Sequence, residues 1–178
     1  LYDEVEGDKE KVYVKEMQLD TDFELLFPDD YINNITERLN LYTQLNDVED
    51  EEGLQKFEAQ LVDRFGELPE PAVDLMNSVR IKWIATHIGL EKVIMKKGKF
   101  IGYFIADQQS SFYQSAVFTQ VLQYAQTHPQ LVKLKEKQTR NGLRLLLVFE
   151  RITSVDKALK VLEPFTPLKS PQGNNVSA

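Results

Sequence analysis

The chain has 178 residues, 42% of them hydrophobic, so it can bury a core and is not a disordered sequence. It has no cysteine, which excludes disulfides, thiolate metal sites and cysteine nucleophiles and suits a reducing, cytoplasmic location, and no apolar run is long enough to span a membrane. The net charge of −7 is uneven, with 19 acidic and 6 basic side chains in residues 1–66 but 9 and 15 in residues 67–178, which fits either a charged partner or acidic helices followed by lysine-rich strand edges.

The first part of the chain predicts extended and then helical structure. It opens on Leu1 in an acidic stretch, and we interpret residues 1–11 as a linker from an upstream part of a larger protein. Residues 12–27 show patches of alternation, which predict one or two extended segments. Asn33 or Asn34 can cap the next helix. The expected apolar stripe of that helix is Ile35, Leu39, Tyr42 and Leu45.

Two further helices follow. The acidic run at residues 47–52 precedes a second apolar stripe at helical spacing, and carboxylates suit the positive end of a helix. This stripe is Leu54, Phe57, Leu61 and Phe65. Gly66 can end that helix, and Pro69 and Pro71 can set the turn into the next one. Residues 72–88 are apolar on most of their circumference, which predicts a central helix.

The remaining elements alternate between hairpins and helices. Residues 92–95 and 100–105 predict two strands joined at Lys97-Gly98. Ser110 or Ser111 can cap a helix that runs to Thr127. A second hairpin is predicted from residues 131–137 and 143–149, with Asn141-Gly142 at its turn, and Thr153 with Asp156 forms a capping box for a last helix.

This order predicts an α+β fold: an extended segment, three helices and then ββαββα. We expect the helical N-terminal half to pack with a small antiparallel sheet in one domain over residues 12–165. The polar residues 166–178 predict a disordered tail.

No motif in the sequence indicates catalysis, a cofactor or a metal. His87 and His128 lack a nearby carboxylate or second histidine at ligand spacing, so structural roles are expected for both. Gly98-Lys99 lacks the upstream glycine and following Ser or Thr of a phosphate loop, and the run at residues 47–52 lacks the alternating ligands of a calcium loop. We therefore predict a domain that is not an enzyme and that binds another protein surface.

A second hypothesis rests on the basic residues of the predicted strands. A sheet that displays lysines with Tyr103 and Phe104 could follow a nucleic-acid backbone. Lys133, Lys135 and Lys137 alternate with other residues, however, and this is also the ordinary pattern of a strand with one solvated face.

Two phrases of the sequence resemble a known family. They are FPDDYINNITERLNLY at residues 27–42 and LVDRFGELPEPAVDLMNSVRIKWIATHIGLEKV at residues 61–93. Their order and spacing are similar to those of the C-terminal domain of bacterial transcription-repair coupling factor, over about residues 12–165. The final tail matches nothing in that family.

The resemblance implies a role in regulation. It implies a parent that is an ATP-driven DNA translocase, with ATP and Mg in upstream motor domains, which displaces stalled RNA polymerase and recruits nucleotide-excision repair. The domain would pack on an N-terminal repair-helicase-like module of the same chain and mask the surface that binds the damage-recognition ATPase. Family members can carry an acidic residue where this chain has Gln60, a departure that weakens one expected ion pair, whereas Asp63 and Arg64 remain. The resemblance thus assigns partner binding to Gln60, Asp63 and Arg64. For Asp63 and Arg64, a structural role as end-of-helix charges that hold the turn is an equal alternative.

Overall fold

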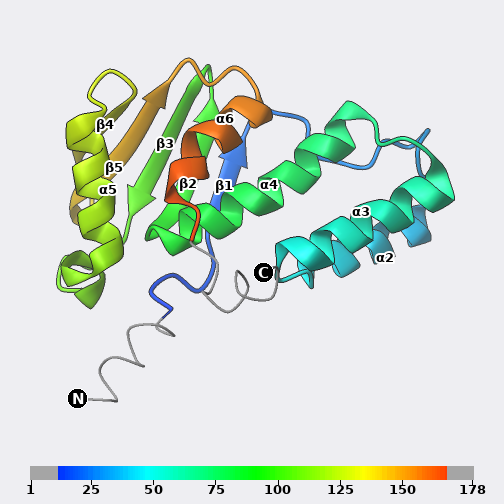
Figure 1. Ribbon diagram of the computed structural model, residues 1–178, viewed down its shortest axis with the longest axis horizontal. Helices are drawn as coiled ribbons and strands as arrows, with labels where there is room; N and C mark the ends of the chain where they lie inside the picture. The colour runs from blue at the N-terminus through cyan, green and yellow to red at the C-terminus, as the bar shows by residue number, and fades with distance from the viewer. Residues whose placement is uncertain (1–11, 168–178) are drawn as a thin grey trace, which may run out of the picture. The chain divides into compact units, whose positions relative to one another are not determined.

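The protein has the predicted α+β fold, and a computed structural model describes its residues 12–167 (Figure 1). The described elements, in chain order, are β1 (Gln18–Thr21), α2 (Ile35–Asn46), α3 (Glu51–Phe65), α4 (Glu70–His87), β2 (Leu90–Lys96), β3 (Lys99–Phe104), η1 (Ser111–Gln114), α5 (Ala116–Thr127), β4 (Val132–Thr139), β5 (Gly142–Glu150), α6 (Val155–Leu162) and η2 (Glu163–Phe165). The expected linker at residues 1–11 lies outside the described residues, as does the expected tail except for Thr166 and Pro167.

The contacts between residues divide the chain into two compact units. We call residues 23–81 the helical unit, and residues 12–22 with 82–167 the sheet unit. The division falls inside α4, so this helix contributes to both units.

In the helical unit, helices α2 and α3 both begin with side-chain caps. Asn34 Oδ1 accepts from the backbone N–H of Glu37 at 2.9 Å, which confirms the predicted start of α2. Asp50 Oδ1 caps α3 by accepting from Gly53 N at 2.8 Å. Gly66 ends α3 with a φ of +90°, as predicted. Short polar side chains thus satisfy the first-turn N–H groups that a helix leaves unpaired.

The predicted stripe of α2 is wrong at two positions. Ile35 and Leu39 are 64% and 61% exposed, and the helix instead buries Leu41 and Leu45. Arg38 takes part of the inward face, since its guanidinium donates to the carbonyl of Ile32 at 2.8 Å. Because Arg38 occupies this inward position, the buried face of α2 does not include Ile35 and Leu39. The stripe predicted for α3 is confirmed at Leu54, Phe57 and Leu61, which are buried, whereas Phe65 at the end of the helix is only partly buried.

The sheet unit is built on five strands in the order β1-β2-β3-β5-β4. The two predicted hairpins form its antiparallel part, with β2 paired to β3 and β5 paired to both β3 and β4. The extended segment contributes the remaining strand, because β1 pairs parallel to β2, from Gln18 opposite Lys92 to Thr21 opposite Met95. The sheet is therefore mixed, with one parallel edge strand.

One face of this sheet carries the core of the unit. Phe100, Phe104 and Phe149 are fully buried on it. Figure 1 shows α5 and α6 on the same side of the sheet, and the ring of Phe104 contacts those of Phe112 and Phe118 at centroid distances of 6.3 and 5.7 Å. The helices thus cover one face, and the lysine-bearing face is the opposite one.

The turns and helix starts predicted for the sheet unit form at the predicted residues or one residue away, but the helix predicted after Ser110 is divided in two. Lys97 and Gly98 form the β2–β3 turn with φ values of +53° and +76°, as a two-residue hairpin turn requires. The β4–β5 turn forms at Arg140 and Asn141, with Gly142 in the first position of β5. The predicted helix after Ser110 is interrupted, because Ser115 is extended and caps a separate α5. The cap of α6 is Ser154 rather than Thr153.

Candidate interaction surface

Two of the three predicted partner-binding residues lie together on the exposed side of α3. Gln60 and Asp63 are both exposed, and they are neighbours because residues three apart share a helix face. The opposite side of α3 is fixed by its buried leucine and phenylalanine side chains. This arrangement offers one carboxylate and one amide to a partner.

The third residue, Arg64, has a partner within the helical unit. Its guanidinium forms an ion pair with Glu37 of α2 and lies 4.8 Å from the ring centroid of Phe65. Its side chain is 52% exposed, so it can still contact another molecule at its edge. Sequence reasoning missed Glu37, because no local spacing connects residues 27 positions apart; only the charges of the two side chains hint at the pair.

The end of α3 is held by Tyr31 as well. The Tyr31 hydroxyl contacts the carbonyl of Gly66 at 2.8 Å and that of Leu61 at 3.3 Å, and burial raises the pKa of this hydroxyl. Its ring lies 5.7 Å from that of Phe65. The D-R-F-G phrase that carries the family resemblance therefore has a structural role at the end of a helix.

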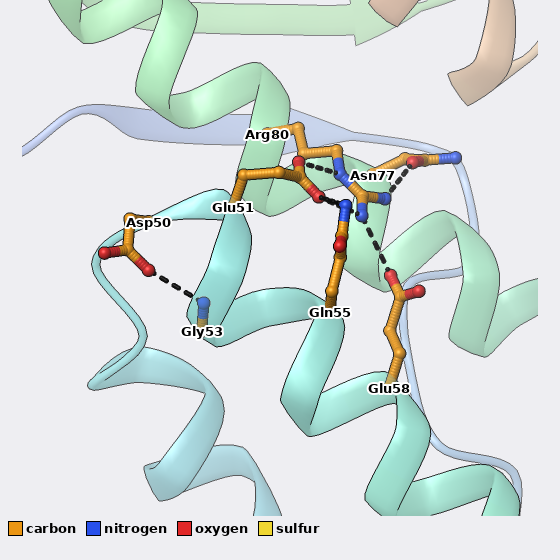
Figure 2. Close-up of polar contacts among 7 residues, drawn as sticks. All are labelled: Asp50, Glu51, Gly53, Gln55, Glu58, Asn77 and Arg80. Atoms are coloured by element: carbon orange, nitrogen blue, oxygen red, sulfur yellow. Dashed lines mark hydrogen bonds and ion pairs between the residues drawn. The ribbon is translucent and has the colours of Figure 1, made fainter. Parts of the chain in front are cut away.

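A second polar network joins α3 to the part of α4 that belongs to the helical unit (Figure 2). Arg80 binds Glu51 through two parallel contacts of 2.7 and 2.8 Å, donates to Glu58 at 3.1 Å and donates to Asn77 at 2.9 Å. The hydrogen bond to Glu51 is the largest influence on the pKa of Arg80 and raises it. Because the Arg80 side chain is only 22% exposed, this network fixes the position of α3 against α4.

The helical unit as a whole is strongly acidic. Residues 23–81 contain 14 acidic and 4 basic side chains, a net charge of −10. Within the described range 12–167, no three His, Asp or Glu side chains are grouped so that they could hold a metal ion. A surface with this net negative charge favours a partner whose surface is basic.

The basic residues of the alternative hypothesis lie in the sheet unit. Lys133, Lys135 and Lys137 share one face of β4 and are exposed, as the alternation predicts. The described part of the sheet unit carries 14 basic and 9 acidic side chains, a net charge of +5. The charge division predicted from the sequence thus follows the two units.

One of the two histidines, His87, lines a groove of the sheet unit. The groove, of about 760 Å³, runs between the end of α4, α5 and η2, and His87 and Tyr124 line it. Burial lowers the pKa of His87. The imidazole of His128 stacks on Tyr124 with 3.9 Å between the ring centroids, and its Nδ1 lies 2.9 Å from the Tyr124 carbonyl oxygen, so His128 contributes to the end of α5.

Over residues 12–167, no helix is long and apolar enough to cross a membrane.

Comparison with known families identifies a family model that matches this sequence. The family model of the TRCF domain matches residues 21–115, just over half of the chain. The chain belongs to the TRCF domain family. The matched residues include the helical unit and the first hairpin of the sheet unit, where the two characteristic phrases lie.

The TRCF domain is similar to parts of much longer relatives. It is 35% identical to the transcription-repair-coupling factor of Escherichia coli (strain K12) over 68 residues, which are 38% of this chain and 6% of that protein. It is 24% identical to the transcription-repair-coupling factor of Rickettsia bellii over 136 residues, 76% of this chain and 11% of that protein. The chain therefore spans only a small part of the curated relatives it matches.

The fold of the TRCF domain is also found in a solved structure. The crystal structure of the C-terminal domain of a transcription-repair coupling factor superposes with a TM-score of 0.60, covering 84% of this chain and 93% of the other. Because the sequences are 17% identical, this likeness concerns the fold. It extends the similarity beyond the residues matched by the family model.

Proposed function

We propose that this TRCF domain is a non-catalytic regulatory domain of a transcription-repair coupling factor that acts in the cytoplasm. It packs on the N-terminal repair-helicase-like module of the same parent chain and masks the surface that binds the damage-recognition ATPase. ATP, Mg and DNA are bound by the motor domains of the parent, which displaces stalled RNA polymerase. The motivation is membership of the TRCF family together with the surface of α3.

The observation that supports this proposal is the pair of outward side chains on a fixed helix. Gln60 and Asp63 are exposed, while α3 is held on one flank by the Arg64–Glu37 ion pair and on the other by the Arg80 network. A surface that is already ordered loses little conformational entropy on binding. A partner with a basic surface would be favoured by the net charge of −10 of the helical unit.

Masking requires an interface of moderate strength. A shift from 1% to 99% of the open state needs about 5.5 kcal/mol of differential binding. A small polar interface within one chain can be overcome by engagement of the parent elsewhere, whereas a large apolar one could not. The exposed polar character of α3 around Asp63 fits a contact that forms and separates.

The test compares the affinity of the damage-recognition ATPase for four forms of the parent protein. Deletion of this domain and the substitution Asp63→Lys should both raise the affinity, because each removes the masking contact. Glu49→Lys is the matched control: it changes the charge equally at another exposed position of the helical unit and should leave the affinity unchanged. An unchanged affinity after deletion would contradict masking, and a response to deletion but not to Asp63→Lys would show that Asp63 is not part of the contact.

A further inference from the structure

The face of the sheet opposite α5 and α6 carries an uneven distribution of charge. Its side chains follow from the register, in which Lys133, Val148, Ile101, Ile94 and Asp20 form one row across the strands. The next row is Lys135, Leu146, Tyr103, Lys92 and Gln18. We call this surface the open face. Its cations are Lys92, Lys96, Lys99, Lys133, Lys135, Lys137 and Arg144.

Lys96 and Lys99 of the open face are neutralised by carboxylates, whereas the lysines of β4 are not. Lys96 pairs with Asp20 at 2.8 Å, and Lys99 pairs with Glu150 at 3.7 Å. Among the residues that the structure describes, no carboxylate forms an ion pair with Lys133, Lys135 or Lys137. The β4 side of the open face therefore keeps its positive charge.

Tyr103 lies at the centre of a cluster of cations. Lys92, Lys137 and Arg144 lie 5.9, 5.7 and 5.4 Å from its ring centroid. Lys137 Nζ donates to the Tyr103 hydroxyl oxygen at 3.3 Å. Because an ammonium group has no acceptor, the phenolic hydrogen stays available for an acceptor from outside. Tyr103 and Lys137 thus present two adjacent donors toward an anion.

The position of Arg144 is fixed by its own hydrogen bonds. Its guanidinium donates to the carbonyl of Phe104 at 2.7 Å and to Glu91 at 3.3 Å. The cluster is therefore ordered without a ligand. Protection of the exposed sheet edge explains lysines on β4, but it does not explain cations on the inner strands, where Lys92 and Arg144 lie.

We propose that the open face binds the phosphate backbone of nucleic acid, through Tyr103, Lys133, Lys135 and Lys137. Alternate residues of a strand are about 6.8 Å apart. Lys133, Lys135 and Lys137 therefore form a regular row of positive charge along β4, which can follow the negative charges of a phosphate backbone. The ring of Tyr103 is surrounded by cations, so it contributes its hydroxyl rather than a stacking surface, and binding does not depend on base sequence.

The experiment measures fluorescence anisotropy of labelled duplex DNA and single-stranded DNA with the 178-residue chain over a series of salt concentrations. The triple substitution Lys133→Gln, Lys135→Gln and Lys137→Gln should weaken binding at least about tenfold and reduce the slope of log K against log salt by about 3. Tyr103→Phe, which removes only the hydroxyl, should weaken binding with an unchanged slope.

The matched control removes the same charge from other exposed positions. Lys56→Gln, Lys157→Gln and Lys160→Gln, all outside the open face, should leave the salt slope unchanged. Equal weakening by the control, or the absence of salt-sensitive binding, would overturn the proposal. Equal competition by polyglutamate of the same charge would also overturn it, since the surface would then be one for acidic proteins. The proposal concerns other residues than masking, so either can fail alone.

Discussion

Gly89 is a position where the backbone and a neighbouring ring together require glycine. It follows α4 with a φ of +83°, a conformation that side chains with a Cβ rarely adopt. A Cβ at this position would lie 2.3 Å from Cζ of Phe112, whose ring is fully buried. The end of α4 and the start of η1 therefore depend on one residue without a side chain.

Gly89→Ala is expected to destabilise the protein more than Gly98→Ala does. Gly98 has a similar φ of +76°, but a Cβ there would meet no atom within 4 Å. Gly98→Ala should therefore cost about 1–2 kcal/mol for backbone conformation alone, and Gly89→Ala should cost about 1–3 kcal/mol more for the displaced ring. Urea unfolding of both variants measures the difference; equal midpoints would contradict the close approach of Phe112.

At the scale of single elements, the Arg80 network joins helix α3 to helix α4 through hydrogen bonds and ion pairs. Arg80 reaches two carboxylates on the same helix, Glu51 and Glu58, and its side chain is less exposed than either. The carboxylates lie seven residues apart, two turns along one helix face. One guanidinium thus holds two turns of α3.

Arg80→Ala should lower the free energy of unfolding by about 1–3 kcal/mol, because it removes charge-assisted hydrogen bonds and leaves the half-buried Glu58 without its cation. Lys56→Ala is the control on the same helix. It breaks the exposed pair with Glu52 at 3.3 Å and should cost about 0.5 kcal/mol or less. Denaturant unfolding in low and high salt measures both variants; an Arg80→Ala midpoint equal to that of Lys56→Ala would show that the network is not a stabilising contact.

The sequence predicted the elements well where the signals are local. The caps at Asn34 and the turn at Lys97-Gly98 depend on residues within three positions, so their chemistry is visible in the sequence. The face of α2 was mispredicted because Arg38 binds the carbonyl of Ile32, a contact that apolar periodicity does not contain. The parallel pairing of β1 with β2 joins residues 74 apart, and no local pattern fixes such a register.

The candidate surfaces were predictable to a similar degree. Exposure of Gln60 and Asp63 followed from the stripe of α3, whose buried positions are local. The engagement of Arg64 with Glu37 did not, since it depends on how α2 and α3 pack. The lysine row of β4 was visible as alternation, but the cation cluster around Tyr103 draws on three strands and appeared only with the sheet register.

At the scale of the whole molecule, the stability of the fold should depend on pH through the partly buried imidazole of His87. Asp and Glu ordinarily titrate near pH 4 and histidine near pH 6.5, so His87 is a group whose protonation changes between about pH 5 and 7. Burial lowers the pKa of His87, so the folded state binds its proton less readily than the unfolded state, where the ordinary pKa is about 6.5. Its contribution to stability is complete above about pH 6.5 and is lost as the pH falls to the lowered pKa.

Wild-type protein should therefore unfold at a lower urea concentration at about pH 5.5 than at about pH 7.5, since acid favours the protonated, unfolded form. His87→Gln should reduce this difference, because an amide does not titrate in that range. His128→Gln is the matched control, since it removes the other imidazole and leaves His87 in the groove beside Tyr124. If the difference between the two pH values is the same in His87→Gln as in the wild type, burial of His87 does not govern the acid sensitivity of the fold.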